Sequence, residues 1–216
     1  HSLVGGIMGA GIMGLGFEKL VFGGLTKVFA GIVIAPIGGI IFGLLLTGLI
    51  ITIFASRRPA PVNKTFGRLQ IISSAWFALT HGANDGQKTM GIIVLILFSA
   101  GMIPELEMPL WVIFAAATAM GLGTFFGGYK VIKTLGVKIT RLRPYQGFAA
   151  ETGGGLMLAV FAIFGIPAST THAITGTIMG AGAARRKRAV RWKVSRQIVF
   201  SWIITIPGAA AMGIGF

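Results

Sequence analysis

The chain has no cysteine and only five acidic residues among its 216 residues, so several kinds of site are excluded at the outset. Without cysteine it forms neither a disulfide framework nor a cysteine metal site. It also has no zinc-ligand spacing, P-loop, nucleophile elbow or dinucleotide fingerprint. Charged residues make up 11% of the chain, whereas a soluble domain usually carries roughly 25%. We therefore expect no bound metal or cofactor, and we expect a membrane protein.

Long hydrophobic runs take the place of the missing charge. Residues 28–54 carry no charge, residues 109–129 carry none either, and both runs exceed the ~18–20 residues that span a bilayer. Exposed sheet edges are not tolerated in hydrocarbon, so the spans are expected to be helices. The sequence predicts an all-α integral membrane protein. Because it opens with His1 rather than Met and has no signal peptide, we expect it to be part of a longer chain.

The net charge of +14 is concentrated in connectors between the apolar runs. This distribution is typical of loops on the cytoplasmic side of a membrane and of contact with anionic headgroups. Few aromatic residues are interleaved, so nucleic-acid binding is not expected. The three groups of basic residues are Arg57, Arg58, Lys64 and Arg68; Lys130, Lys133, Lys138, Arg141 and Arg143; and Arg185, Arg186, Lys187, Arg188, Arg191, Lys193 and Arg196.

The pattern of runs and connectors predicts an order of elements. Basic connectors on both sides of residues 147–184, with the break GIPASTT at 165–171, indicate a re-entrant hairpin that enters and leaves on one side. The full series is a helix at 1–16, a connector at 17–27, a span at 28–54, a basic loop at 55–68, a broken helix at 69–101, a short loop at 102–108, a span at 109–129, a basic loop at 130–146, the hairpin at 147–184 and a final span at 197–216.

Part of the chain recurs. HSLVGGIMGAG at 1–11 matches HAITGTIMGAG at 172–182, so that His1 corresponds to His172, and the same offset aligns Pro36 with Pro207. The connector after the first copy is nearly neutral and that after the second is strongly basic, so the copies are expected to insert in opposite directions. We interpret 1–54 as the end of a first inverted repeat and 69–216 as the second. Small-xxx-small spacing in both copies predicts close helix contacts.

Two motifs place polar groups at membrane depth. The first is HGANDGQK at 81–88, with Asn84, Asp85, Gln87 and Lys88 inside an apolar run. It predicts either an ion pair that only joins helices or an interrupted helix whose free backbone groups bind an anion and a small cation. The second is Ser169, Thr170 and Thr171 after Pro167. Here hydroxyl and N–H groups at the start of a helix predict an anion site, or alternatively an ordinary N-cap.

Three further residues are candidates with two interpretations each. His81 and His172 either transfer protons or form structural hydrogen bonds, and the structural interpretation is favoured. Glu151 stands alone in an apolar arm, and it either binds a cation or proton or forms a buried pair.

The two motifs, with His81–Lys88 followed by Pro167–His172, resemble those of the inorganic phosphate transporter (PiT) family, and the form with Gln87 and Lys88 is similar to the bacterial low-affinity permeases. The resemblance covers essentially the whole chain. It implies a cell-membrane symporter with two inverted repeats that works by alternating access. Phosphate would be bound by Asn84, Gln87, Lys88, Ser169, Thr170 and Thr171, and a coupling cation, H⁺ in preference to Na⁺, by Asp85 and Glu151. It leaves open whether a metal–phosphate complex is carried and whether the protein is a homo-oligomer.

Two other functions are kept as alternatives. One is a structural or receptor-type membrane protein whose buried polar residues only join helices. The other is an intramembrane hydrolase that uses Ser169 with His172, although the sequence offers no third group to orient the histidine. For the transporter, a complete site requires the upstream repeat, so we expect the 216-residue chain alone not to transport phosphate.

Overall fold

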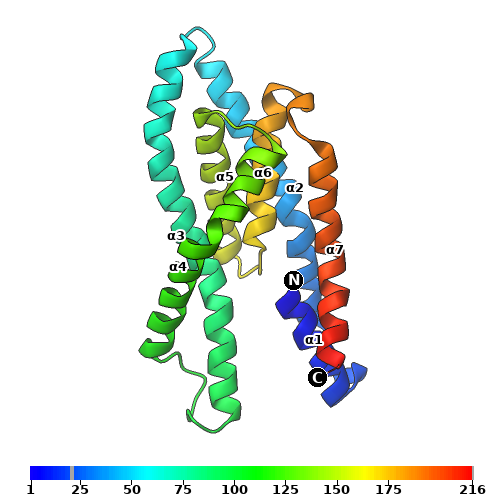
Figure 1. Cartoon of the computed structure of the whole chain (residues 1–216). Helices are drawn as coiled ribbons and strands as arrows, with labels where there is room; N and C mark the ends of the chain where they lie inside the picture. Colours follow the sequence, from blue (N-terminus) through cyan, green and yellow to red (C-terminus); the bar gives the residue numbers. More distant parts are fainter. Residues whose placement is uncertain (20–21, 216) are drawn as a thin grey trace.

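The structure, a computed structural model, describes residues 1–19 and 22–215, which contain α-helices and short helical turns but no strand. The all-α prediction is confirmed. Residues 20, 21 and 216, which belong to the predicted connector 17–27 and the predicted last span, lie outside the described residues. The α-helices are α1 (Ser2–Leu15), α2 (Phe22–Ile53), α3 (Pro59–Ser99), α4 (Leu110–Lys133), α5 (Pro144–Ile163), α6 (Thr170–Arg185) and α7 (Trp192–Ile214) (Figure 1).

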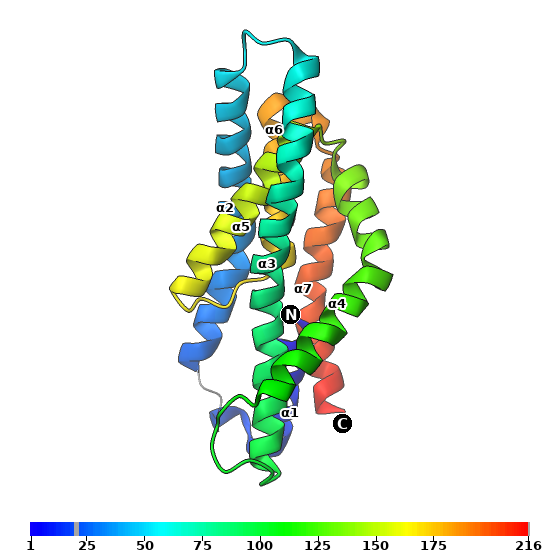
Figure 2. The same cartoon turned by 90° about the vertical axis from the view of Figure 1, so that its left-hand side faces the viewer.

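Four helical segments are long and apolar enough to cross a membrane: Phe22–Ile53, Leu110–Ile139, Pro144–Ile163 and Trp192–Ile214. Helix α3 has 41 residues and is therefore about 61 Å long, which exceeds the ~40–45 Å thickness of a whole bilayer. It runs the full height of the bundle in both views (Figures 1 and 2). The chain is therefore a multi-pass membrane protein.

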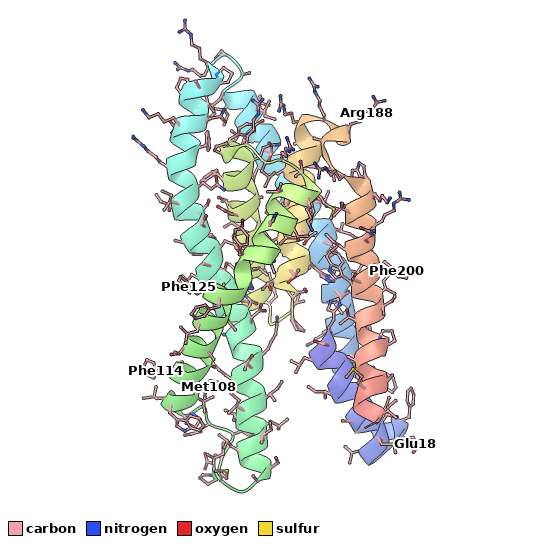
Figure 3. The ribbon with its side chains drawn as sticks, in the orientation of Figure 1. Glu18, Met108, Phe114, Phe125, Arg188 and Phe200 are labelled. Atoms are coloured by element: carbon pink, nitrogen blue, oxygen red, sulfur yellow. The ribbon has the colours of Figure 1, made fainter. Side chains whose placement is uncertain are left out.

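The two ends of the bundle differ in charge. The connections α2–α3, α4–α5 and α6–α7 all lie at the upper end in Figure 1. Arg188 is at this end in Figure 3, whereas Glu18 and the segment around Met108 are at the opposite end. The basic connectors thus share one side, as their composition predicted. The positive-inside rule predicts that this side faces the cytoplasm.

The predicted loops are shorter than expected because the helices extend into them. Helix α3 starts at Pro59, so most of the predicted basic loop 55–68 is helical. Proline suits the first helical position because its missing N–H would have no partner there. Similarly, α4 continues to Lys133 and a π-helical segment covers Thr134–Ile139, within the predicted loop 130–146.

Helices α5 and α6 form the predicted re-entrant hairpin. Both arms leave from the upper end, and their connection lies about halfway down the bundle (Figure 1). Gly165 begins the turn with a φ of 60°, a backbone conformation that favours glycine. At the upper end the Gln146 side chain donates a hydrogen bond of 2.7 Å to the Ala181 carbonyl, which joins the two arms. The tip is only partly enclosed by this chain, because Ala168 and Thr170 are buried whereas Ile163 and Phe164 are exposed.

Glycines allow two pairs of helices to approach closely. Helix α6 packs on α2, and a Cβ atom at Gly176 or Gly180 would collide with the carbonyl of Pro36 or Ile40. Helix α1 packs on α7, where a Cβ atom at Gly5 would meet the Ile206 carbonyl. The small-residue spacing noted in the sequence therefore marks real interfaces. In lipid such contacts stabilise helix pairs through van der Waals packing.

We predict different effects on stability from two glycine-to-alanine changes on α2. Gly39→Ala places a Cβ atom against the Ala173 carbonyl of α6, whereas Gly48→Ala meets nothing within 4 Å. Overpacking of this kind destabilises by about 1–3 kcal/mol. Thermal unfolding in detergent should show a lower melting temperature for Gly39→Ala and an unchanged or higher one for Gly48→Ala. Equal melting temperatures would contradict the close α2–α6 contact.

Candidate functional site

A cavity of about 320 Å³ lies at the hairpin tip, between the tip, α1, α2 and α3. It combines polar groups from α3 and the tip with an apolar wall from α1 and α2. Its lining residues are His1, Leu3, Val4, Val28, Ile32, Asp85, Lys88, Pro167, Ala168, Ser169, Thr170 and Thr171. Thus Asp85 and Lys88 of the first motif meet Ser169, Thr170 and Thr171 of the second. About 80 residues of sequence separate the two motifs, and the hairpin brings them together.

The first motif does not interrupt its helix. Residues 81–88 are α-helical throughout, so the predicted broken helix at 69–101 is wrong in this conformation. The polar groups are satisfied without unwinding, because the Asn84 side chain donates to the Thr80 carbonyl one turn earlier, at 2.9 Å. Asp85 finds its partners on neighbouring side chains. Gly82 and Gly86 are tolerated inside the helix, where a Cβ atom at Gly86 would meet only Met90.

Asp85 is the centre of the site. Its Oδ2 atom lies 3.0 Å from His81 Nε2 and accepts a hydrogen bond of 2.9 Å from the Thr170 hydroxyl. Its Oδ1 atom accepts one of 2.9 Å from Lys88 Nζ. His81, Asp85 and Lys88 are spaced i, i+4 and i+7, so all three lie on one face of α3. A carboxylate at this depth is therefore paired, as its cost in a membrane requires.

Lys88 also reaches the hairpin. Its ammonium group donates a second hydrogen bond of 2.9 Å to the Ala168 carbonyl in the tip. Directly after Ala168, Ser169 is the N-cap of α6, and its hydroxyl accepts a bond of 3.4 Å from the His172 N–H. The start of a helix has N–H groups without intrahelical partners and carries a partial positive charge. The cavity wall thus offers an ammonium group, three hydroxyls and a helix N-terminus, which together suit an anion.

Asn84 and Gln87 do not line this cavity. Asn84 is bound to its own helix, and Gln87 is exposed. Two residues correspond to about 200° around a helix, so Gln87 points away from the face that carries Asp85. Their predicted role in binding phosphate is therefore not supported by the described residues alone.

Glu151 belongs to a separate cluster. It accepts hydrogen bonds from the Ser73 hydroxyl at 2.6 Å and from the Gln70 amide at 3.4 Å, across the α3–α5 interface. Ser73 lies twelve residues before Asp85 on α3, which is about 18 Å along the helix toward the basic end. Gln70 and Ser73 had not been identified from the sequence. Their i, i+3 spacing in an otherwise apolar run was the available signal.

His172 has a structural environment. It is 2% exposed, its Nδ1 atom lies 3.2 Å from the Ile32 carbonyl of α2, and its ring stacks on Trp202 with centroids 3.6 Å apart. Pro36 has no N–H group, so it leaves the Ile32 carbonyl without its usual partner four residues later. His172 supplies the missing donor from Nδ1. The ring of His1 packs edge-on against His172 at 4.3 Å.

The same geometry argues against the hydrolase alternative. A nucleophile and its base must be within hydrogen-bond reach through the imidazole ring. Here Ser169 is contacted by the backbone of His172, while the ring nitrogen Nδ1 faces α2. Among the described residues no group of three or more His, Asp or Glu side chains is arranged to hold a metal ion.

The helices and the polar, anion-compatible cavity between them place the chain among multi-pass membrane proteins with an intramembrane binding site. This arrangement is typical of transporters. Comparison with known proteins is more specific. The model of the phosphate transporter family matches residues 54–213.

Curated relatives extend the match to nearly the whole chain. A probable low-affinity inorganic phosphate transporter of Rhizobium meliloti is 47% identical over 97% of this chain and 63% of its own length. One of Bacillus subtilis is 39% identical over 99% of this chain and 64% of its own. A solved structure titled "The sodium-dependent phosphate transporter" has a TM-score of 0.81 and 22% identity, covering 98% of this chain and 70% of that one. The chain belongs to the phosphate transporter family, and it spans under two thirds of the length of these curated relatives.

We predict that Lys88 holds the hairpin tip on α3. Lys88→Met removes a charge-assisted hydrogen bond, typically worth about 1.5–3 kcal/mol, which corresponds to roughly tenfold or more in local opening. Hydrogen exchange should therefore accelerate by at least about tenfold in residues 168–172. Gln87→Met, one residue away and exposed, is the control and should leave exchange unchanged. Equal exchange in both variants would contradict the role of Lys88.

Proposed function

We propose that the full-length protein transports inorganic phosphate together with a cation by alternating access, and that the cavity at the hairpin tip is this chain's half of the site. The observation that carries the proposal is the meeting of Lys88, Asp85 and the N-terminus of α6 in one cavity. This arrangement pairs an anion subsite with a carboxylate. The family membership and the names of the relatives support phosphate as the anion.

The anion subsite is built from the tip. Ser169, Thr170 and Thr171 contribute hydroxyls, and the first N–H groups of α6 contribute the positive end of the helix. Lys88 adds a compact positive charge next to them, bound to the Ala168 carbonyl. A phosphate in the cavity accepts hydrogen bonds from these donors. We assign its recognition to Lys88 and to the three hydroxyls.

Charge balance requires a cation. Asp85 and Lys88 neutralise one another as an ion pair, so a phosphate anion adds uncompensated negative charge at membrane depth. When Lys88 turns toward phosphate, Asp85 also loses the hydrogen bond from its ammonium group. A proton or sodium ion bound at Asp85 restores neutrality, and phosphate entry is thereby coupled to cation entry. We favour H⁺ as the coupling ion.

Glu151 offers a second position for the coupling cation. It has two hydrogen-bond donors and no cationic partner among the described residues. Its partner Ser73 lies about 18 Å along α3 from Asp85, toward the cytoplasmic end, a place that suits a cation on its way out of the site. Asn84 and Gln87 lie outside this cavity. We propose that they contribute to phosphate binding only together with the part of the site that the rest of the full-length protein supplies.

We further propose that α1–α2 and α6–α7 are inverted repeats. The contacts support this proposal, because His1 Nδ1 faces the Trp202 carbonyl at 3.3 Å and His172 Nδ1 faces the Ile32 carbonyl at 3.2 Å. In Figure 1, α1 runs from the middle of the bundle to the lower end and α6 from the middle to the upper end. The two histidines are 171 positions apart in the sequence, whereas their carbonyl partners, Ile32 and Trp202, are 170 positions apart. A polar cavity between two such halves suits alternating access by rocking of one half.

Replacing Asp85 tests the coupling mechanism. In proteoliposomes, Asp85→Asn in the full-length protein should lower phosphate uptake by at least about tenfold, or about 1.4 kcal/mol, because the amide no longer binds the cation. The fold should persist, since Asn still accepts the Thr170 hydrogen bond, although Lys88 loses its countercharge. A protein whose polar residues only join helices would behave in the opposite way, with reduced stability and intact uptake.

Replacing Glu151 tests the second cation position. Glu151→Gln keeps an acceptor for Ser73 and removes the charge, so the fold should persist. We expect uptake driven by an imposed cation gradient to fall several-fold, while exchange of phosphate across the membrane without a gradient continues. Glu105→Gln, in the loop at the opposite end, is the matched control and should alter neither. Equal gradient-driven uptake in the two variants would remove Glu151 from coupling.

A further inference from the structure

A long groove runs between α2 and α7, on the far side of the hairpin from the Glu151 cluster. We propose that it binds one anionic phospholipid of the cytoplasmic leaflet, with an acyl chain in the apolar part of the groove and the phosphate of the headgroup at Arg196. This inference is independent of phosphate transport.

The groove consists of two adjoining cavities of about 550 and 420 Å³. They share Ile40 of α2, Met179 of α6, and Val199 and Ile203 of α7, so they form one continuous channel. Between Trp192 and Pro207 the wall on α7 is about 22 Å long, which exceeds half of the ~30 Å hydrocarbon core. The groove therefore has the depth of one leaflet.

Its deeper part is suited only to hydrocarbon. The lining is made of aliphatic and aromatic side chains, apart from His172, whose Nδ1 atom is engaged by the Ile32 carbonyl. Apart from Trp202 and His172, no lining side chain offers a polar group, and burying a ligand's polar groups unpaired is unfavourable. The residues are Phe29, Ile32, Val33, Pro36, Ile37, Ile40, His172, Met179, Val199, Trp202, Ile203, Ile206 and Pro207. A hydrocarbon chain fills this space without leaving a polar group unpaired.

The upper part changes in character. Trp192, Ser195 and Arg196 line it at the cytoplasmic end, with Trp192 about one helical turn before the other two on α7. Ser195 is 4% exposed, and its hydroxyl has no hydrogen-bond partner among the described residues. Since this oxygen is itself closed off from solvent, the position open to a ligand is that of the next residue. Arg196 is exposed beside it and carries the forked donors that match a phosphate group.

Charge selects an anionic headgroup. Arg188, Arg191 and Lys193 precede Ser195 within a few residues, and Arg188 lies at the upper end of the bundle (Figure 3). None of the described acidic side chains lines either cavity. Basic pockets between helices on the cytoplasmic side are suited to anionic lipid headgroups. A second copy of the chain would bring an equally basic end to this surface and would be repelled.

Native mass spectrometry of the full-length protein tests the proposal. Purified protein is mixed with phosphatidylglycerol or phosphatidylcholine, and the retained lipid is counted. We expect at least a fivefold preference for phosphatidylglycerol, which is lost in Arg196→Gln. The control is Arg68→Gln, which removes the same charge at the same end on α3 and should keep the preference. Equal loss in Arg68→Gln and Arg196→Gln, or no headgroup preference in the wild type, would overturn the proposal.

A photoactivatable phosphatidylglycerol identifies the groove itself. Cross-links should map to residues 29–40 of α2 and 196–207 of α7, and Ile203→Trp, which fills the shared part of the two cavities, should reduce them several-fold. Cross-links confined to other helices would refute the assignment. A cross-link from α7 to an upstream segment of the full-length chain in place of the lipid would refute it equally, because that segment would then occupy the groove.

Discussion

The arrangement at mid-membrane depends on how the charge of Asp85 is satisfied. An unpaired carboxylate at this depth is strongly unfavourable, and His81, Lys88 and Thr170 each contact it. Two of these partners also hold the hairpin, since Thr170 begins α6 and Lys88 binds the Ala168 carbonyl in the tip. The interactions that make the carboxylate tolerable therefore keep a non-helical turn in place inside the membrane, where its backbone must be enclosed by protein.

This dependence also connects structure with the proposed transport. Because Lys88 divides its donors between Asp85 and the tip, any anion that attracts Lys88 weakens both contacts. In the proposed cycle, a cation at Asp85 would compensate for the first loss, and hydroxyl contacts from the tip to phosphate would compensate for the second. Occupancy of the site and the position of the hairpin would then be coupled through one side chain, as the proposed alternating access requires.

The position of the hairpin relative to α2 has a different physical origin. Glycines at 39, 43, 176 and 180 let the two backbones meet, and His172 bonds to the carbonyl that Pro36 leaves free. Packing and one hydrogen bond thus fix α6 against α2, while charge fixes its start against α3. The cavity lies where these two contacts converge. The second groove exists because α2 and α7 do not contact one another there, and residues of α6 line the space between them.

Much of this could be predicted from the sequence. Composition and run length determined the class, the distribution of Lys and Arg determined which connectors share a side, and Gly165 and Pro167 marked the turn of the hairpin. Those features act locally, through solvent and backbone preference, and so they are visible in the chain. The family resemblance named both motifs, and the structure brings Asp85 and Lys88 to Thr170 and Ala168.

Other features were decided only by tertiary structure. The motif at 81–88 suggested an interrupted helix, yet α3 continues because partners on α6 and on its own turns satisfy Asn84 and Asp85. Glu151 was grouped with Asp85 by chemistry, whereas packing pairs it with Ser73 and Gln70 in a separate cluster. The sequence by itself determined which groups must find partners in the membrane. Which partners they found depended on the contacts between distant helices, because a polar group in hydrocarbon binds whatever donor or acceptor the packing places within reach.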